Sequence, residues 1–408
     1  MSTAEPEPPN AGGSVAPERL PHRTFRPSVR EVQAGARNAA RVPLGLLGAV
    51  ALVAAVESSI VRAGPRFLDP VGYCWALAAE AAKTDAPGCG VLLVGDSLVK
   101  HGLAPRVVSE KTGQRAYNLA IPAAPAPATE AVLRRAFDAG ARPKAVVVDL
   151  KPGLLAGGPK YSLRYWPQVL SPPDAVRLAM TAGSSSFAGE LLLHAALPSF
   201  RSRHEVRGDL MAALGGETGP LRKLNALGER HWSVNEGANL ATPRADYSGD
   251  VSEAEHTRYL SRGFSAHRIN VAYARRIIGL ALDRGAKTYL LLPPAVPQLM
   301  ERRTRTGAEG KYEAFVEKLR KEFPRLTVLD ARASGYPPSA FVDPVHLSAL
   351  GALALSDDVA DVLRRDLDAH DPKSGGAWVR LPAYRERPLP DALEHVELSR
   401  ARLEGKTK

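Results

Sequence analysis

Three residues that lie far apart in the sequence have the side chains that nucleophilic catalysis needs. Ser97 follows an apolar run in VLLVGDSLVKHGL, and Asp343 and His346 lie three residues apart in FVDPVHLSALGA. A serine hydroxyl is a poor nucleophile until an imidazole takes its proton, and the imidazole needs a carboxylate that fixes its tautomer and stabilises its charge. Together the three residues predict acyl transfer through a serine ester, if the fold brings them together.

The positions of these motifs along the chain strengthen the prediction. Gly-Asp-Ser ends the first strong strand pattern, and the Asp-x-x-His pair follows the fifth strand pattern and precedes the last helix. A doubly wound sheet gathers the carboxyl ends of its strands at one edge, where ligands bind. An ordinary turn is the alternative for the serine. One helical turn further on, Lys100 and His101 are expected on a solvated helix face, with a place at the edge of the site as the alternative.

The apolar segments predict the elements that would hold these residues. Helical patterns separate the strand patterns, and in one of them, residues 267–285, apolar side chains recur on a single face. Continuous apolar strands between helices are typical of a parallel sheet covered on both faces, so we predict an α/β fold for a domain over residues 67–370. The five buried strands are predicted at residues 90–97, 115–122, 144–150, 286–294 and 325–331.

One long segment, residues 156–263, interrupts this alternation. It is rich in Ser, Arg, Gly and Trp and has helical patterns but no strand pattern. Structureless loops of this length are rare in compact domains, so we predict a helical insertion over the carboxyl edge of the sheet, serving as a lid or substrate platform. Within it, Arg201, Arg203 and Arg207 form either a solvated basic face or a site for an anionic glycan or phosphate headgroup.

The two ends of the chain differ from the middle. Residues 1–41 are rich in Pro, Ala, Gly and Arg and predict a disordered cationic segment. The apolar stretch 42–62 predicts a transmembrane signal-anchor, with a buried helix of a soluble protein as the alternative. The twenty residues before the uncharged run Val42–Val56 contain five arginines, and the twenty residues after it contain two. This bias predicts that the amino end lies in the cytoplasm and the domain outside. Residues 371–408 are Pro- and Gly-rich and predict an irregular tail.

The composition and residue spacing count against several other classes of protein. The net charge is +11, but the arginines are scattered with little aromatic interleaving, so we predict no nucleic-acid partner. The two cysteines, Cys74 and Cys89, allow either one disulfide or two buried thiols, but no cysteine framework. The histidines are dispersed, and neither HExxH nor GxGxxG after a strand occurs, so we predict no metal and no cofactor.

Four stretches carry a family resemblance: VLLVGDSLVKHGL, AYNLAIPAAP, AVVVDLKP and DPVHLS. With them the chain resembles the SGNH (GDSL) hydrolase superfamily and, within it, membrane-anchored envelope proteins similar to polysaccharide O-acetyltransferases. The likeness spans roughly residues 90–365 without the insertion, as judged from motif order. It implies a flavodoxin-like three-layer fold, with Ser97 as nucleophile, His346 as base and Asp343 as the residue that orients the base.

The chain departs from the family pattern at two positions of the oxyanion hole. The family has a glycine in its second block and an asparagine in its third, and this chain has Ala123 and Lys151 there. The backbone N–H of Ala123 and the side chains of Lys151 or Asn118 are the candidate donors. The loss of one such donor costs on the order of 10²–10³ in rate.

Two functions remain as hypotheses from the sequence. The first is a serine-dependent acyl ester hydrolase or O-acyltransferase that acts outside the cytoplasm on an acylated carbohydrate through a Ser97 acyl-enzyme. The second is a catalytically inert envelope protein that keeps the SGNH fold and binds glycan. The departures at Ala123 and Lys151 favour the second, and the intact Ser97, Asp343 and His346 favour the first.

Overall fold

The computed structural model describes residues 44–64, 68–216, 219–259, 263–369, 376–390 and 392–406. The segment predicted to be disordered, residues 1–41, lies outside these ranges. The chain divides into two compact units, residues 1–55 and 56–408, and the second contains the sheet and all the candidate site residues. Both cysteines are free thiols, so the disulfide is not formed.

The second unit is built on a six-stranded parallel sheet in the order β2-β1-β3-β4-β5-β6. This confirms the predicted α/β class. The order reverses direction between β1 and β3, where a doubly wound sheet opens its ligand crevice at the carboxyl edge. The strands are β1 (Val91–Val94), β2 (Ala116–Asn118), β3 (Ala145–Asp149), β4 (Lys287–Leu292), β5 (Leu326–Asp330) and β6 (Trp378–Arg380).

Both faces of the sheet are covered by helices, which explains why the strands are apolar throughout. Along β1, Leu92 and Val94 belong to one hydrophobic cluster, and Val91 and Leu93 belong to another on the opposite face. The helices that contribute side chains to the first cluster include α3 (Pro70–Thr84), α6 (Ala126–Asp138), α15 (Arg268–Asp283) and α17 (Ala308–Glu322). The second receives α4 (Ser97–Gly102), α5 (Pro105–Thr112), α16 (Pro297–Arg305) and α18 (Ala349–Asp368). The domain therefore has three layers, as predicted.

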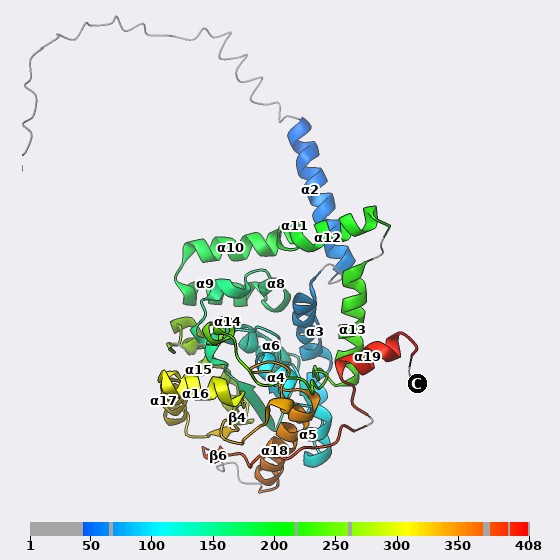
Figure 1. Ribbon diagram of the computed structural model, residues 1–408. Coiled ribbons are helices and arrows are strands. Elements are labelled where there is room, and N and C mark those ends of the chain that lie inside the picture. The colour runs from blue at the N-terminus through cyan, green and yellow to red at the C-terminus, as the bar shows by residue number, and fades with distance from the viewer. Residues whose placement is uncertain are drawn as a thin grey trace, which may run out of the picture. The chain divides into compact units, whose positions relative to one another are not determined.

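The segment 156–263 is helical, and its described residues contain no strand. In Figure 1, α10, α11 and α12 follow one another, while α8 and α9 lie between α10 and the sheet layers. The α10 helix also packs directly against α8 and α9. The helices are α7 (Pro152–Ala156), α8 (Trp166–Val169), α9 (Pro172–Ala182), α10 (Ser185–Ala196), α11 (Pro198–Arg201), α12 (Arg203–Leu214), α13 (Pro220–Val234) and α14 (Glu253–Arg258).

The prediction of an irregular tail over residues 371–408 is wrong. Residues 378–380 form β6, which pairs with β5, and residues 396–403 form the helix α19 (Val396–Leu403). A strand of three residues and a helix of eight are too short for a periodicity to appear in the sequence. Contacts with distant residues stabilise them instead, because short helices are marginal on their own.

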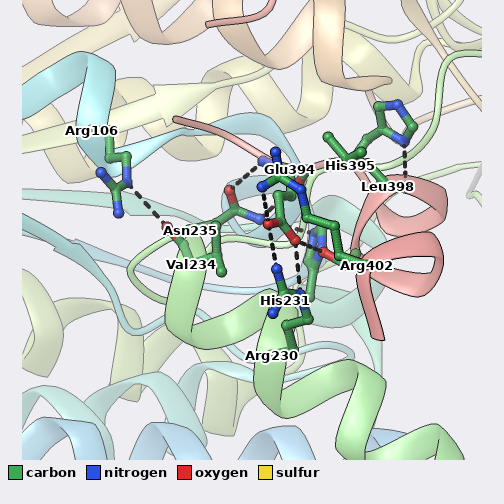
Figure 2. A network of polar contacts seen from close by, with 10 residues as sticks. Arg106, Arg230, His231, Val234, Asn235, Glu394, His395, Leu398 and Arg402 are labelled. Carbon is green, nitrogen blue, oxygen red and sulfur yellow. Dashed lines mark hydrogen bonds and ion pairs between the residues drawn. The ribbon is translucent and has the colours of Figure 1, made fainter. Parts of the chain in front are cut away.

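The side chain of Glu394 attaches this C-terminal segment to α13. Glu394 is 1% exposed, and its carboxylate accepts hydrogen bonds from Arg230 at 2.8 Å, from Ser399 Oγ at 2.7 Å and from Arg402. Figure 2 shows Glu394 between the two arginines, with Asn235 and His231 beside it. Next to this network, Val396 N donates to the carbonyl of Leu240. The C-terminal segment is therefore part of the folded domain.

Near the amino end, α2 (Leu44–Ala63) is long and apolar enough to cross a membrane. Its 18-residue window Gly45–Arg62 has a mean hydropathy of 1.6, and only 6% of the window is buried. A core helix of a soluble protein would be mostly buried, so the exposure of α2 counts against that alternative.

Candidate active site

The turn after β1 places Ser97 at the carboxyl edge of the sheet. Gly95 has a φ of +136°, and Asp96 caps α4 by accepting a hydrogen bond from Leu98 N at 2.8 Å. Ser97 is the first residue of α4 and is 8% exposed. Asp96 is thus a helix cap, and Ser97 lies where the amide dipoles of a helix start favour negative charge.

The loop before α18 holds Asp343 and His346 in a fixed arrangement. One carboxylate oxygen of Asp343 accepts from the backbone N–H groups of Val345 and His346, each at 2.9 Å. The other lies 2.6 Å from His346 Nδ1. Burial opposes the charged form of Asp343, but the hydrogen bonds from His346 and the backbone hold the pKa of this carboxyl well below its ordinary value. A charged Asp343 fixes the proton of His346 on Nδ1 and leaves Nε2 free to accept.

The fold brings the third residue to the other side of the imidazole. His346 Nε2 lies 2.8 Å from Ser97 Oγ, although the two residues are 249 positions apart in the chain. The three side chains therefore form a continuous hydrogen-bonded row from Asp343 through His346 to Ser97. This is the arrangement in which an imidazole can remove the proton of a serine hydroxyl.

A fourth residue, Asp149 at the end of β3, supports the turn that carries the serine. Asp149 Oδ1 accepts a hydrogen bond from Asp96 N at 2.8 Å. A Cβ atom at Gly95 would lie 1.8 Å from this same oxygen, so only glycine fits there. Burial, together with the nearby charge of Asp96, raises the pKa of Asp149 well above its ordinary value. The sequence analysis missed Asp149, although its place at the end of a predicted strand was a usable signal.

A pocket of about 200 Å³ opens beside Ser97 and His346. Ala123 and Lys151, two of the predicted oxyanion candidates, line it. The insertion contributes residues from both of its ends: Gly157 and Gly158 from one end and Arg258 and Tyr259 from the other. Lys151 Nζ lies 5.3 Å from the centre of the Tyr259 ring. Of the predicted lid, it is these end residues that reach the pocket.

The third candidate, Asn118, has a different role. Its amide nitrogen donates to the carbonyls of Val99 and Leu103 at 2.9 and 3.0 Å, and its oxygen accepts from Ala120 N. The residue is fully buried, and both of its N–H groups are used. Asn118 therefore ties β2 to the end of α4 and has no donor left for a substrate.

The backbone at Ala123 has the conformation that a glycine adopts easily. Its φ is +56°, in the left-handed region, which costs a residue with a Cβ roughly 1 kcal/mol. The N–H groups of Ser97 and Ala123 are not taken by any acceptor in the part of the chain that the structure describes. Both remain available as hydrogen-bond donors to an oxyanion.

The prediction that Lys100 lies on a solvated face of α4 is wrong. Its side chain is 1% exposed, donates to the carbonyl of Gly237 and lies 3.2 Å from the centre of the Trp232 ring. His101 lies four residues after Ser97, on the same side of the helix, with its ring 5.2 Å from that of His346. Burial lowers the pKa of His101 to about 3, so this ring stays neutral beside the base.

Comparisons with known proteins add no assignment. No protein-family model matches the sequence, and no curated protein matches it. Among the described residues, no group of three or more His, Cys, Asp or Glu side chains is arranged to hold a metal ion. The geometry of the site itself therefore carries the functional argument.

Proposed function

We propose that this protein is a serine-dependent acyl ester hydrolase or O-acyltransferase of SGNH type that forms an acyl-enzyme on Ser97. The observation that carries the proposal is the row of hydrogen bonds from Asp343 to His346 to Ser97, at 2.6 and 2.8 Å. Both distances are within the range that proton transfer needs. The parallel sheet, with Ser97 after the first strand, is consistent with the SGNH resemblance.

The reaction begins when Ser97 Oγ attacks the carbonyl carbon of the ester while His346 Nε2 takes the hydroxyl proton. Asp343 stabilises the resulting imidazolium, and the N–H groups of Ser97 and Ala123 donate to the oxyanion of the tetrahedral intermediate. Collapse of the intermediate breaks the ester bond, and His346 returns the proton to the leaving alkoxide. Water or a sugar hydroxyl then gives its proton to His346 and attacks the acyl carbon. The bond from this carbon to Ser97 Oγ breaks, and His346 returns the proton to Ser97 Oγ.

The pocket supports a short acyl group on a polar carrier. Its volume of about 200 Å³ is below the 300–1,000 Å³ of ordinary ligand pockets, so it suits the acyl end of a substrate rather than the whole of it. At its rim, Lys151, Arg258 and the ring of Tyr259 offer donors and a flat apolar surface to a polyhydroxyl chain. An acylated carbohydrate is the substrate class we infer.

We further propose that α2 anchors the protein as a single span, with the amino end in the cytoplasm and the sheet domain outside. The support is the apolar window Gly45–Arg62 together with the excess of arginines before it.

The competing function is a catalytically inert domain of the same fold that binds glycan. The observations that favour it are the strained backbone of Ala123 and the lysine at position 151, where the family has glycine and asparagine.

Labelling of the full chain with a fluorophosphonate probe tests the two functions against each other. We expect labelling that Ser97→Ala abolishes and His346→Ala slows by about 10²–10⁴-fold, because the serine loses its general base. Ser185→Ala, at an exposed serine of α10, is the matched control and should label like the unaltered chain. If the folded, unaltered chain does not label, the catalytic proposal fails and the inert alternative stands.

A further inference from the structure

Helices α11 and α12 have an exposed face that is apolar and basic. On α12, Arg203, Arg207, Met211 and Leu214 follow one another at spacings of four, four and three residues, so they share one side of the helix. Met211 is 60% exposed and Leu214 is 75% exposed. Phe200 of α11 is 38% exposed and lies 4.8 Å from the guanidinium of Arg203, which makes it part of the same face. We call these five residues the α11–α12 surface.

The opposite side of α12 is attached to the domain, so the two sides of the helix have distinct roles. Glu205 is buried and forms an ion pair with Arg164, which also pairs with Asp69 before α3. By contrast, no described carboxylate pairs with Arg203 or Arg207. The outward side of α12 thus combines free positive charge with large apolar side chains.

A direct contact joins this region to the end of the proposed membrane span. Ser199 N, in α11, donates to Glu57 Oε2 at 2.8 Å, and Ser199 Oγ donates to the other oxygen of the same carboxylate. Glu57 is the first charged residue after the apolar run of α2. Both residues belong to the second compact unit. Because Glu57 lies in the last third of the window Gly45–Arg62, α11 contacts α2 near the outer end of the proposed span.

We propose that the α11–α12 surface rests on the phospholipid membrane, with Phe200, Met211 and Leu214 in the boundary between headgroups and acyl chains and with Arg203 and Arg207 on lipid phosphates. This combination of apolar side chains and arginines is typical of helices that lie in the membrane interface. The positive charge of arginine is attracted to the phosphates of an anionic leaflet. The inference rests on the proposed membrane anchoring and is independent of the acyl-transfer chemistry.

Depth measurements by spin labelling of the full chain in nanodiscs test the proposal. Nitroxides are attached at Met211→Cys and Leu214→Cys in a chain with Cys74→Ala and Cys89→Ala, and their collisions with oxygen and with a water-soluble nickel chelate are compared. Ala314→Cys, on an exposed position of α17, is the aqueous control. We expect the oxygen-to-nickel ratio at positions 211 and 214 to exceed that at 314 several-fold when the disc contains phosphatidylglycerol. Arg203→Glu with Arg207→Glu should reduce the difference.

A label at Val50→Cys, inside α2, separates the failure of this inference from the failure of the anchor. If the oxygen-to-nickel ratio at position 50 is that of the acyl chains while the ratios at positions 211 and 214 are those of water, the α11–α12 proposal is overturned and the anchor stands. Aqueous values at 50 overturn both. Labels at 211 and 214 that neither reagent reaches indicate a protein partner or a second copy, and they also overturn the proposal. If the charge reversal leaves the depth unchanged, the arginines have no part in the contact.

Discussion

At the scale of single residues, the site has two aspartates whose pKa values are shifted in opposite directions. Asp343 lies against an imidazole and two amides, which stabilise its charge, and its pKa falls. Asp149 is buried next to Asp96, and its pKa rises. The first aspartate orients the base, whereas the second accepts a hydrogen bond from the turn that carries the nucleophile. Their environments alone assign these roles.

We predict that Asp149→Asn retains most of the reactivity of Ser97, because an amide has the shape and hydrogen-bonding groups of the neutral carboxyl. Asp149→Leu should lower the labelling rate about 10- to 100-fold, since it leaves the N–H of Asp96 without a partner and frees the turn. Rates of fluorophosphonate labelling for the two variants, with circular dichroism as the control for folding, check this. Equal rates for both variants would mean that Asp149 does not position the serine.

We predict from the burial of Lys100 that the free energy of unfolding depends on pH in the alkaline range. Burial lowers the pKa of Lys100 to about 7 in the folded chain, whereas the unfolded chain keeps the ordinary value near 10.5. Between these values the unfolded state binds more protons, so the free energy of unfolding rises with pH, by at most about 1.4 kcal/mol per pH unit. Lys100→Met should be more stable at pH 7 and should lose this slope.

Denaturant unfolding between pH 7 and 10 measures the effect of Lys100. Lys318→Met, at an exposed position of α17, is the control and should keep the slope. An unchanged slope in Lys100→Met would show that the folded protein keeps this lysine charged.

At the scale of elements, the attachment of α19 to α13 depends on the carboxylate of Glu394. Hydrogen bonds from two arginines and Ser399 outweigh the burial of Glu394 and lower its pKa to about 2. Its contribution to stability is therefore complete above the unfolded pKa, near 4.5, and is lost as the pH falls from there towards 2.

We predict that Glu394→Gln destabilises the domain by about 3–5 kcal/mol at neutral pH, because it leaves Arg230 and Arg402 without their buried partner. The loss should shrink as the pH falls from 4.5 towards 2, because the unfolded form of the unaltered chain binds a proton at Glu394 that the folded form does not yet bind. Glu397→Gln, at an exposed position of α19, should change the free energy of unfolding by less than about 0.5 kcal/mol. Denaturant midpoints at pH 7 and pH 4 check both statements. Similar losses for the two variants would contradict the assigned role of Glu394.

The elements that the sequence could predict are those with a pattern of their own. The five strands between residues 91 and 330 are continuous apolar runs, and each was found within a few residues. The triad residues could be placed because each follows a strand or precedes a helix. By contrast, β6 depends on β5, and its Trp378 binds Asp330, 48 positions earlier. The helix α19 and the burial of Lys100 depend on partners more than a hundred residues away, which no local pattern displays. For Asn118 the sequence left open a structural hydrogen bond and an oxyanion contact, because its partners, the carbonyls of Val99 and Leu103, are not displayed by any sequence pattern.

At the scale of the whole molecule, the proposed location requires that α2 holds the protein at a membrane. Exposed apolar residues along α2, such as Val50 at 59% and Val53 at 52%, need a bilayer or a partner to cover them. Their insertion is the assumption on which both the proposed location and the α11–α12 surface depend.

We predict that Val50→Arg with Val53→Arg moves the chain out of the membrane fraction after carbonate extraction. An arginine at the centre of a span costs about 2.5–3.5 kcal/mol on insertion. Val61→Arg, beyond Glu57 and near the end of the helix, should stay with the membrane like the unaltered chain. If all three chains fractionate alike, α2 does not anchor the protein.

The attachment of the C-terminal segment has a consequence for the order in which the chain is made. Ser97 is synthesised early, His346 follows 249 residues later, and Glu394 comes close to the end. Val396 binds Leu240, and the neighbouring Ala241 bridges to Ser348, two residues after the base. A chain still emerging from the ribosome or the translocation channel therefore has a serine without its base and a base loop without its support. In the proposed topology, we therefore expect the nascent protein to become reactive only after the segment that contains Glu394 and Val396 has crossed the membrane.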